Sequence, residues 1–196
     1  MRARRDAAVL RAVGLALCLA APLGTAHGSE SPAPLFQQAV GAFEAGRYGE
    51  ARERFSALAE EAHPESHYNL GVLYEQGHGV TEDYARALEH YRAAAERQVP
   101  EAQYNLGLMY QEGQGVPQDR SAAAEWFRAA AEQGHEPAMT NLAALYERGL
   151  GVPRDAARAR DWYRRAGAWD PSEATRRHAL EELQVSSPSA VITSLE

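Results

Sequence analysis

The side chains that could do chemistry in this sequence are histidines and carboxylates, and one cluster of them has the spacing of a metal site. His63 and His67 lie four residues apart, with Glu60 and Glu61 close by, and such spacing can bring metal ligands together. Pro64 separates the two histidines, so we expect them to lie on different helices at an ordinary turn. The sequence therefore predicts no metal and no other cofactor.

The remaining histidines and carboxylates do not complete a catalytic motif. His135 and Glu136 begin the zinc-protease pattern His-Glu-x-x-His, but Met139 occupies the position of its second histidine. Adjacent carboxylates such as Glu60 and Glu61 diverge by about 100° on a helix, so they cannot face one substrate together. All 20 basic residues are arginine, which excludes mechanisms that need a lysine. We therefore predict that the protein is not an enzyme.

Composition favours a helical protein with an acidic surface. The chain has 196 residues, of which 45% are hydrophobic, and this is enough for a packed core. The formal net charge is −7 and there is no run of basic residues, so no nucleic-acid partner is expected. Cys18 is the only cysteine, so the part of the chain that follows it has no disulfide and no thiolate ligand.

Residues 1–26 have the pattern of a secretory signal peptide. Basic residues precede an apolar run at 12–21, and Gly24 and Ala26 are the small residues expected before a cleavage site. The run is shorter than the roughly 18–20 residues of a membrane-spanning helix, so we expect cleavage and no membrane insertion afterwards. This pattern predicts a periplasmic protein, with secretion from the cell as the alternative. A flexible linker and a disordered tail are expected at 27–34 and 184–196.

A comparison of the sequence with itself reveals a period of 36 residues. Shifted by 36, Tyr68-Asn69-Leu70-Gly71 falls on Tyr104-Asn105-Leu106-Gly107, and a second shift gives Thr140-Asn141-Leu142-Ala143. The same shifts align a tyrosine, two glycines and an aspartate: Tyr74, Gly77, Gly79 and Asp83, then Tyr110, Gly113, Gly115 and Asp119, then Tyr146, Gly149, Gly151 and Asp155. So many matches at one period indicate a repeat protein.

Each repeat has the pattern of two helices joined by a glycine turn. Leu70, Leu73 and Tyr74 have the i, i+3, i+4 spacing of an apolar helix face. Gly77 can take the left-handed conformation that ends a helix, and Asp83 is placed to cap the next helix. The predicted units are a shorter repeat at 35–63, full repeats at 64–99, 100–135 and 136–170, and a capping helix at 171–183.

The repeated pattern resembles the Sel-one-like repeat, a relative of the tetratricopeptide repeat. The resemblance is carried by Tyr-Asn-Leu-Gly-x-x-Tyr-x-x-Gly-x-Gly-Val at 68–80 and by its copies, whereas the spacing within 35–63 is closer to a true tetratricopeptide repeat. It implies an all-α fold, a right-handed α-solenoid of antiparallel helix pairs that serves as a binding scaffold. Thr140 and Ala143 depart from the pattern, so we expect the packing of the third repeat to differ.

By analogy with the tetratricopeptide fold, the first helix of each repeat should line a concave groove. The expected floor residues are mostly apolar: Phe36, Val40, Tyr68, Val72, Tyr104, Leu108, Thr140 and Ala144. The expected edge residues are mostly acidic: Glu75, Gln111, Glu112, Glu147 and Arg148. An apolar floor with an acidic rim suits an amphipathic helix or an extended segment that carries basic residues. Because Tyr68 and Tyr104 belong to the repeat consensus, the alternative for these two is packing between repeats.

These observations predict a non-catalytic protein–protein interaction scaffold of the bacterial cell envelope, with an envelope or membrane-associated protein as its partner. One alternative is an envelope enzyme that acts on peptidoglycan or a β-lactam through groove residues. The family members linked to β-lactams are cysteine-rich, whereas no repeat here contains a cysteine, so that activity is not carried over. The other alternative is a self-assembling spacer that associates through the ends of the solenoid.

Overall fold

The computed structural model describes residues 32–167, and within this range the chain forms eight α-helices and no strand. The helices are α2 (Pro32–Glu44), α3 (Tyr48–Glu60), α4 (Pro64–Gln76), α5 (Tyr84–Ala95), α6 (Pro100–Glu112), α7 (Arg120–Glu132), α8 (Glu136–Arg148) and α9 (Ala156–Arg165). The predicted signal peptide, the capping helix at 171–183 and the tail at 184–196 lie outside the described residues. Since α2 begins at Pro32, the last three residues of the predicted linker are helical.

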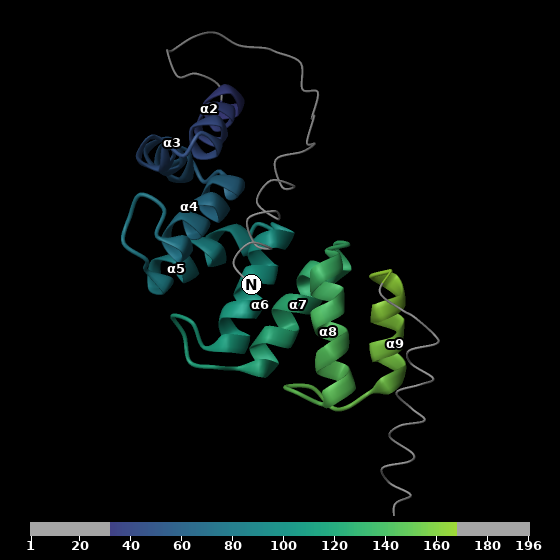
Figure 1. Cartoon of the computed structure of the whole chain (residues 1–196). Coiled ribbons are helices and arrows are strands. Elements are labelled where there is room, and N and C mark those ends of the chain that lie inside the picture. The colour runs from purple at the N-terminus through teal and green to yellow at the C-terminus, as the bar shows by residue number, and fades with distance from the viewer. Residues whose placement is uncertain (1–31, 168–196) are drawn as a thin grey trace, which may run out of the picture.

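The helices form pairs that follow one another in chain order. Figure 1 shows the pairs along an arc from α2–α3 through α4–α5 and α6–α7 to α8–α9, with successive helices running in opposite directions. Each helix packs mainly against its neighbours in the sequence. This is the all-α solenoid of antiparallel helix pairs that the sequence predicts. No helix in the described range is long and apolar enough to cross a membrane.

The predicted start and stop signals are present in all three full repeats. The Asp83 side chain accepts a hydrogen bond from the backbone N–H of Arg86 at 3.0 Å, which caps α5. Asp119 and Asp155 cap α7 and α9 in the same way. The first helix of each repeat ends at a glycine with positive φ, as at Gly77, where φ is 67°. The sequence pattern therefore determines where these helices begin and end.

A glycine in the first helix allows the two helices of a repeat to approach closely. A Cβ atom on Gly71 would lie 2.6 Å from the ring of Tyr91, and one on Gly107 would lie 2.5 Å from the ring of Phe127. Both rings are completely buried. In α4–α5 and α6–α7, the absent side chain therefore makes room for the aromatic ring that fills the centre of the pair.

The second glycine of each turn joins one repeat to the repeat before it. A Cβ atom on Gly79 would lie 2.8 Å from the Cβ of Tyr48, and one on Gly115 would lie 2.6 Å from the backbone oxygen of Tyr84. Gly151 packs in the same manner against the backbone of Arg120. We call these three contacts the glycine joints. They bring each turn against the first residue of the second helix in the preceding unit.

Candidate partner-binding surface

Three of the predicted floor residues lie in the hydrophobic core. Val40 and Tyr68 are each 5% exposed and Val72 is 2% exposed, so no partner can contact them in this structure. Tyr68 and Val72 pack in the cluster that joins α4, α5 and α6, and Val40 packs in the cluster that joins α2, α3 and α4. The second expectation for Tyr68, packing between repeats, is the one that its burial favours.

The other predicted floor residues remain partly accessible. Phe36 is half-buried and its ring lies 4.8 Å from the ring of His63, while Tyr104 is half-buried with its ring 4.7 Å from His135. Leu108 on α6 and Ala144 on α8 are half-buried and occupy equivalent positions in successive repeats. The accessible part of the predicted floor therefore lies mainly on α6 and α8.

The predicted acidic rim is largely engaged inside the molecule. The Tyr91 hydroxyl donates a hydrogen bond of 2.6 Å to the Glu75 carboxylate, and the Tyr163 hydroxyl donates one of 3.1 Å to Glu147. Glu112 is exposed on α6 and, like Glu75 and Glu147, takes part in a further interaction. These three residues therefore do not form a rim of free carboxylates that could bind a basic partner.

We call the place where α4, α5 and α6 meet the first junction. Its polar side chains form hydrogen bonds with one another. The Tyr91 hydroxyl, which donates to Glu75 on α4, is also hydrogen-bonded by the Asn105 side chain on α6. Burial and the nearby Glu75 carboxylate raise the pKa of Tyr91 well above its usual value, so the hydroxyl stays protonated and remains a donor. One buried hydroxyl thus links three helices.

The second junction, where α6, α7 and α8 meet, has equivalent residues but no such link. Gln111, Phe127 and Asn141 stand where the first junction has Glu75, Tyr91 and Asn105. The Phe127 ring is completely buried and has no hydroxyl. Within the described part of the chain, the side-chain amides of Gln111 and Asn141 have no hydrogen-bond partner.

A pocket of about 360 Å³ opens at the second junction, and we call it the Arg120–Arg148 pocket. It is lined by polar and apolar side chains from α6, α7, α8 and the turn after α8: Gln111, Arg120, Asn141, Ala144, Leu145, Arg148 and Leu150. Three predicted groove residues, Gln111, Ala144 and Arg148, therefore share one pocket. Arg120 and Arg148 are exposed, and neither makes an ion pair or a side-chain hydrogen bond with any described residue.

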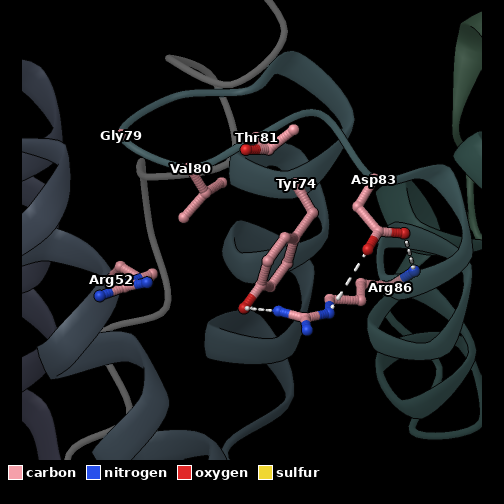
Figure 2. A pocket seen from close by; sticks show the side chains of 7 residues that line it. All are labelled: Arg52, Tyr74, Gly79, Val80, Thr81, Asp83 and Arg86. Atoms are coloured by element: carbon pink, nitrogen blue, oxygen red, sulfur yellow. Dashed lines mark hydrogen bonds and ion pairs between the residues drawn. The ribbon is translucent and has the colours of Figure 1, made fainter.

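A second pocket, of about 380 Å³, lies between α3, α4 and the turn before α5, and Figure 2 shows its lining. Its most prominent cation, Arg86, points between the Tyr74 hydroxyl at 3.5 Å and the Asp83 carboxylate at 3.4 Å. Arg52 lies on the opposite wall. Because Asp83 neutralises Arg86, this pocket holds one cation without a partner among the described residues, Arg52, whereas the Arg120–Arg148 pocket holds two.

The histidine cluster differs from the sequence expectation in one respect. His63 is the N-cap of α4 and His67 lies in the first turns of the same helix, so the two do not lie on different helices. His67 instead faces His90 on α5, with 3.2 Å between their Nδ1 atoms, and His63 contacts the Ser66 hydroxyl at 3.1 Å. In the described residues, no three His, Cys, Asp or Glu side chains are grouped to hold a metal ion.

The Arg120–Arg148 pocket was missed at the sequence level, although a signal for it exists. Tyr91 and Glu75 are both replaced in the second repeat, by Phe127 and Gln111, and the third repeat returns to Tyr163 and Glu147. The two positions lie 16 residues apart and change together, as expected if they contact each other. Comparison of the repeats with one another would therefore have identified both the internal hydrogen bond and the repeat that lacks it.

Comparisons with known proteins agree with this architecture. The Sel1 repeat model matches residues 64–99, 100–135 and 136–168, which is more than half of the chain. No curated protein matches. The structure of a protective antigen of uropathogenic Escherichia coli with an SLR fold is 33% identical, with a TM-score of 0.66 over 69% of this chain and 30% of the antigen. A Sel1 repeat protein from Oxalobacter formigenes is 30% identical, with a TM-score of 0.67 over 74% of this chain and 60% of that protein.

The chain thus spans less than two thirds of either of these relatives, and what they share with it is the repeat array. Proteins built from Sel1 repeats are generally interaction scaffolds that bind other proteins, and the fold is typically non-catalytic. The three matched repeats, with their capped helix pairs and glycine turns, show that the chain belongs to the Sel1 repeat family.

Proposed function

We propose that this protein is an exported, non-catalytic scaffold that holds a segment of a partner protein across α6 and α8. The observation that carries the proposal is the Arg120–Arg148 pocket, which is lined by the accessible floor residue Ala144 and by Gln111, one helical turn along α6 from Leu108. Apolar side chains from Ala144 and Leu150 provide contact area, and the surrounding polar groups provide orientation. Such a surface suits a short peptide segment.

The export part of the proposal is supported by the N-terminal pattern of basic residues, apolar run and small residues. We expect the mature chain to begin at His27 and to fractionate with the periplasm. Mass spectrometry of the protein recovered from fractionated cells measures both. A chain that keeps Met1 and stays in the cytoplasmic fraction would contradict export, and it would leave the binding surface unaffected.

Binding at this surface is tested by photo-crosslinking in cells. A photoreactive p-benzoylphenylalanine replaces Ala144 in the pocket, or Ala157, which is exposed on α9, as the matched control. We expect position 144 to give a defined crosslinked band that position 157 does not give. Equal bands at both positions, or none at 144, would contradict the proposal that α6 and α8 form the partner surface.

A further inference from the structure

We infer that the Arg120–Arg148 pocket is a carboxylate-binding subsite, which takes an aspartate or glutamate side chain from an acidic segment of the partner. The inference rests on the proposed function and gives the chemistry of the partner. It reverses the sequence expectation of a basic partner, because the groups that line this pocket are cationic or neutral.

The first reason is that the two arginines are unpaired. Five other arginines of the repeats have partners within the chain, whereas Arg52 on α3 has none among the described residues; the paired ones are Arg86 with Asp83, Arg158 with Asp155, Arg164 with Asp161, Arg92 with Tyr110 and Arg128 with Tyr146. Arg120 and Arg148 have none among the described residues, and both line one pocket. A carboxylate between two guanidinium groups forms charge-assisted hydrogen bonds, which are stronger than neutral ones.

The second reason is that two amides of the pocket are available as donors. In the first junction, the Tyr91 hydroxyl engages both polar neighbours. Phe127 cannot do this, so Gln111 and Asn141 keep their amide N–H groups for a ligand. The loss of one hydroxyl therefore supplies two neutral donors to the same pocket that holds the two cations.

The third reason is that the backbone at the pocket is held in place. The glycine joint packs Gly151 against the backbone of Arg120, and the Ser121 hydroxyl donates a hydrogen bond of 2.9 Å to the Gly151 carbonyl. Arg148 is the last residue of α8, directly before its glycine C-cap. Both arginines thus project from fixed helix ends, which reduces the entropy lost when a ligand binds.

The equivalent place in the first junction would reject the same ligand. The positions that correspond to Gln111, Arg120 and Arg148 are occupied there by Glu75, Tyr84 and Glu112. Two carboxylates stand where the pocket has an amide and a guanidinium. Of the two junctions, only the second is therefore expected to prefer an acidic segment.

The test is a selection of peptides on the full chain. A random heptapeptide display library is panned against the wild type, against the double variant Arg120→Glu/Arg148→Glu, and against the control Arg164→Glu/Arg165→Glu. The control changes the same number of charges in the last turn of α9. Circular dichroism verifies that each variant is folded. A selected peptide is then made with a photoreactive residue, and its crosslink is mapped by mass spectrometry.

We expect the wild type and the control to select peptides rich in aspartate and glutamate, whose crosslinks map to α6–α8. The double variant should bind these peptides at least about tenfold more weakly and select arginine or lysine instead. If the selected peptides crosslink to α6–α8 but show no acidic preference, or bind the double variant equally well, the carboxylate subsite is wrong and the proposed function stands. If no peptide crosslinks to α6–α8, both are wrong.

Discussion

In the first junction, the hydroxyl of Tyr91 joins Glu75 to Asn105, whereas in the second junction Phe127 leaves Gln111 and Asn141 without a partner. The two junctions have the same helix arrangement and the same glycine joints. Their difference shows that the polar groups at this place can serve either of two purposes. Where a hydroxyl ties them together they stabilise the solenoid, and where it is absent they remain available to a ligand.

The largest expected effect comes from a charge in the core of the first junction. Val72→Glu puts a carboxylate at a position that is 2% exposed, and we expect it to lower the free energy of unfolding by on the order of 4 kcal/mol. Leu108→Glu, at the equivalent half-buried position, should cost about 1 kcal/mol. Urea denaturation monitored by circular dichroism measures both. Equal losses would show that the two junctions are buried alike.

A smaller loss is expected at the glycine joint of the second junction. Gly151→Ala places a Cβ against the Arg120 backbone at a φ of 72°, and we expect it to cost about 3 kcal/mol in unfolding free energy. Gly134→Ala is the control, because its φ is also positive but no atom lies within 4 Å of its Cβ. The control should cost about 1 kcal/mol. If both variants lose the same amount, the joint adds nothing beyond backbone strain.

The hydroxyl itself can be moved from one junction to the other. Tyr91→Phe leaves Glu75 and Asn105 without their shared partner, and we expect a loss of about 2 kcal/mol in unfolding free energy. Phe127→Tyr should instead link Gln111 to Asn141, raise stability by up to about 1 kcal/mol and weaken the binding of acidic peptides several-fold. Denaturation and peptide titration test the pair. A Phe127→Tyr variant that binds these peptides as the wild type does would contradict the role of the free amides.

The smallest effect distinguishes the junctions by pH. Burial lowers the pKa of His67 and His90, with Arg97 contributing at His67 and the other histidine at His90, so the folded state favours their neutral forms. Their contribution to stability is therefore present above about pH 6.5 and is lost as the pH falls below it. Gln103 and Trp126 occupy the equivalent positions in the second junction and do not titrate there.

We expect the free energy of unfolding to fall between pH 7 and pH 5, and to fall less in the double variant His67→Gln/His90→Trp. His135, whose pKa is also lowered by burial, keeps part of the acid sensitivity in that variant. Denaturation curves at the two pH values provide the comparison. An identical pH dependence in the wild type and the double variant would mean that the facing histidines contribute nothing.

The repeat period predicted the helices, their caps and the family, because these depend on short-range chemistry. Asp83 caps a helix through its own backbone neighbours, and Gly77 ends one through its own φ, so each is readable from local sequence. Gly71 allows close helix contact because it has no side chain, and the Tyr91 ring occupies the space that a Cβ would need. Helix caps and helix ends of this kind recur in every repeat that carries the same residue at the same position.

The groove could not be predicted to the same degree, because burial depends on how the repeats stack. Val72 and Leu108 hold equivalent positions at a variable place in the repeat, yet the first is in the core and the second is partly accessible. The burial of each residue depends on the position of its repeat along the solenoid, and the sequence period carries no information about that position. Arg148 was expected at the edge of the groove, but its pairing with Arg120 in one pocket was not, since the two arginines meet only when two repeats are assembled.

The glycine joints have a consequence for how this array can change over generations. Gly115 and Gly151 press against the main chain of residues 84 and 120, so the joint does not depend on which side chain those residues carry. Tyr84 and Arg120 are accordingly different residues in otherwise equivalent surroundings. A duplicated repeat therefore keeps its glycine joint to the preceding repeat. The residue at the position of Arg120, beside the pocket, can then be substituted without disturbing that joint. The same freedom offers protein engineers a position where ligand preference can be rewritten one repeat at a time.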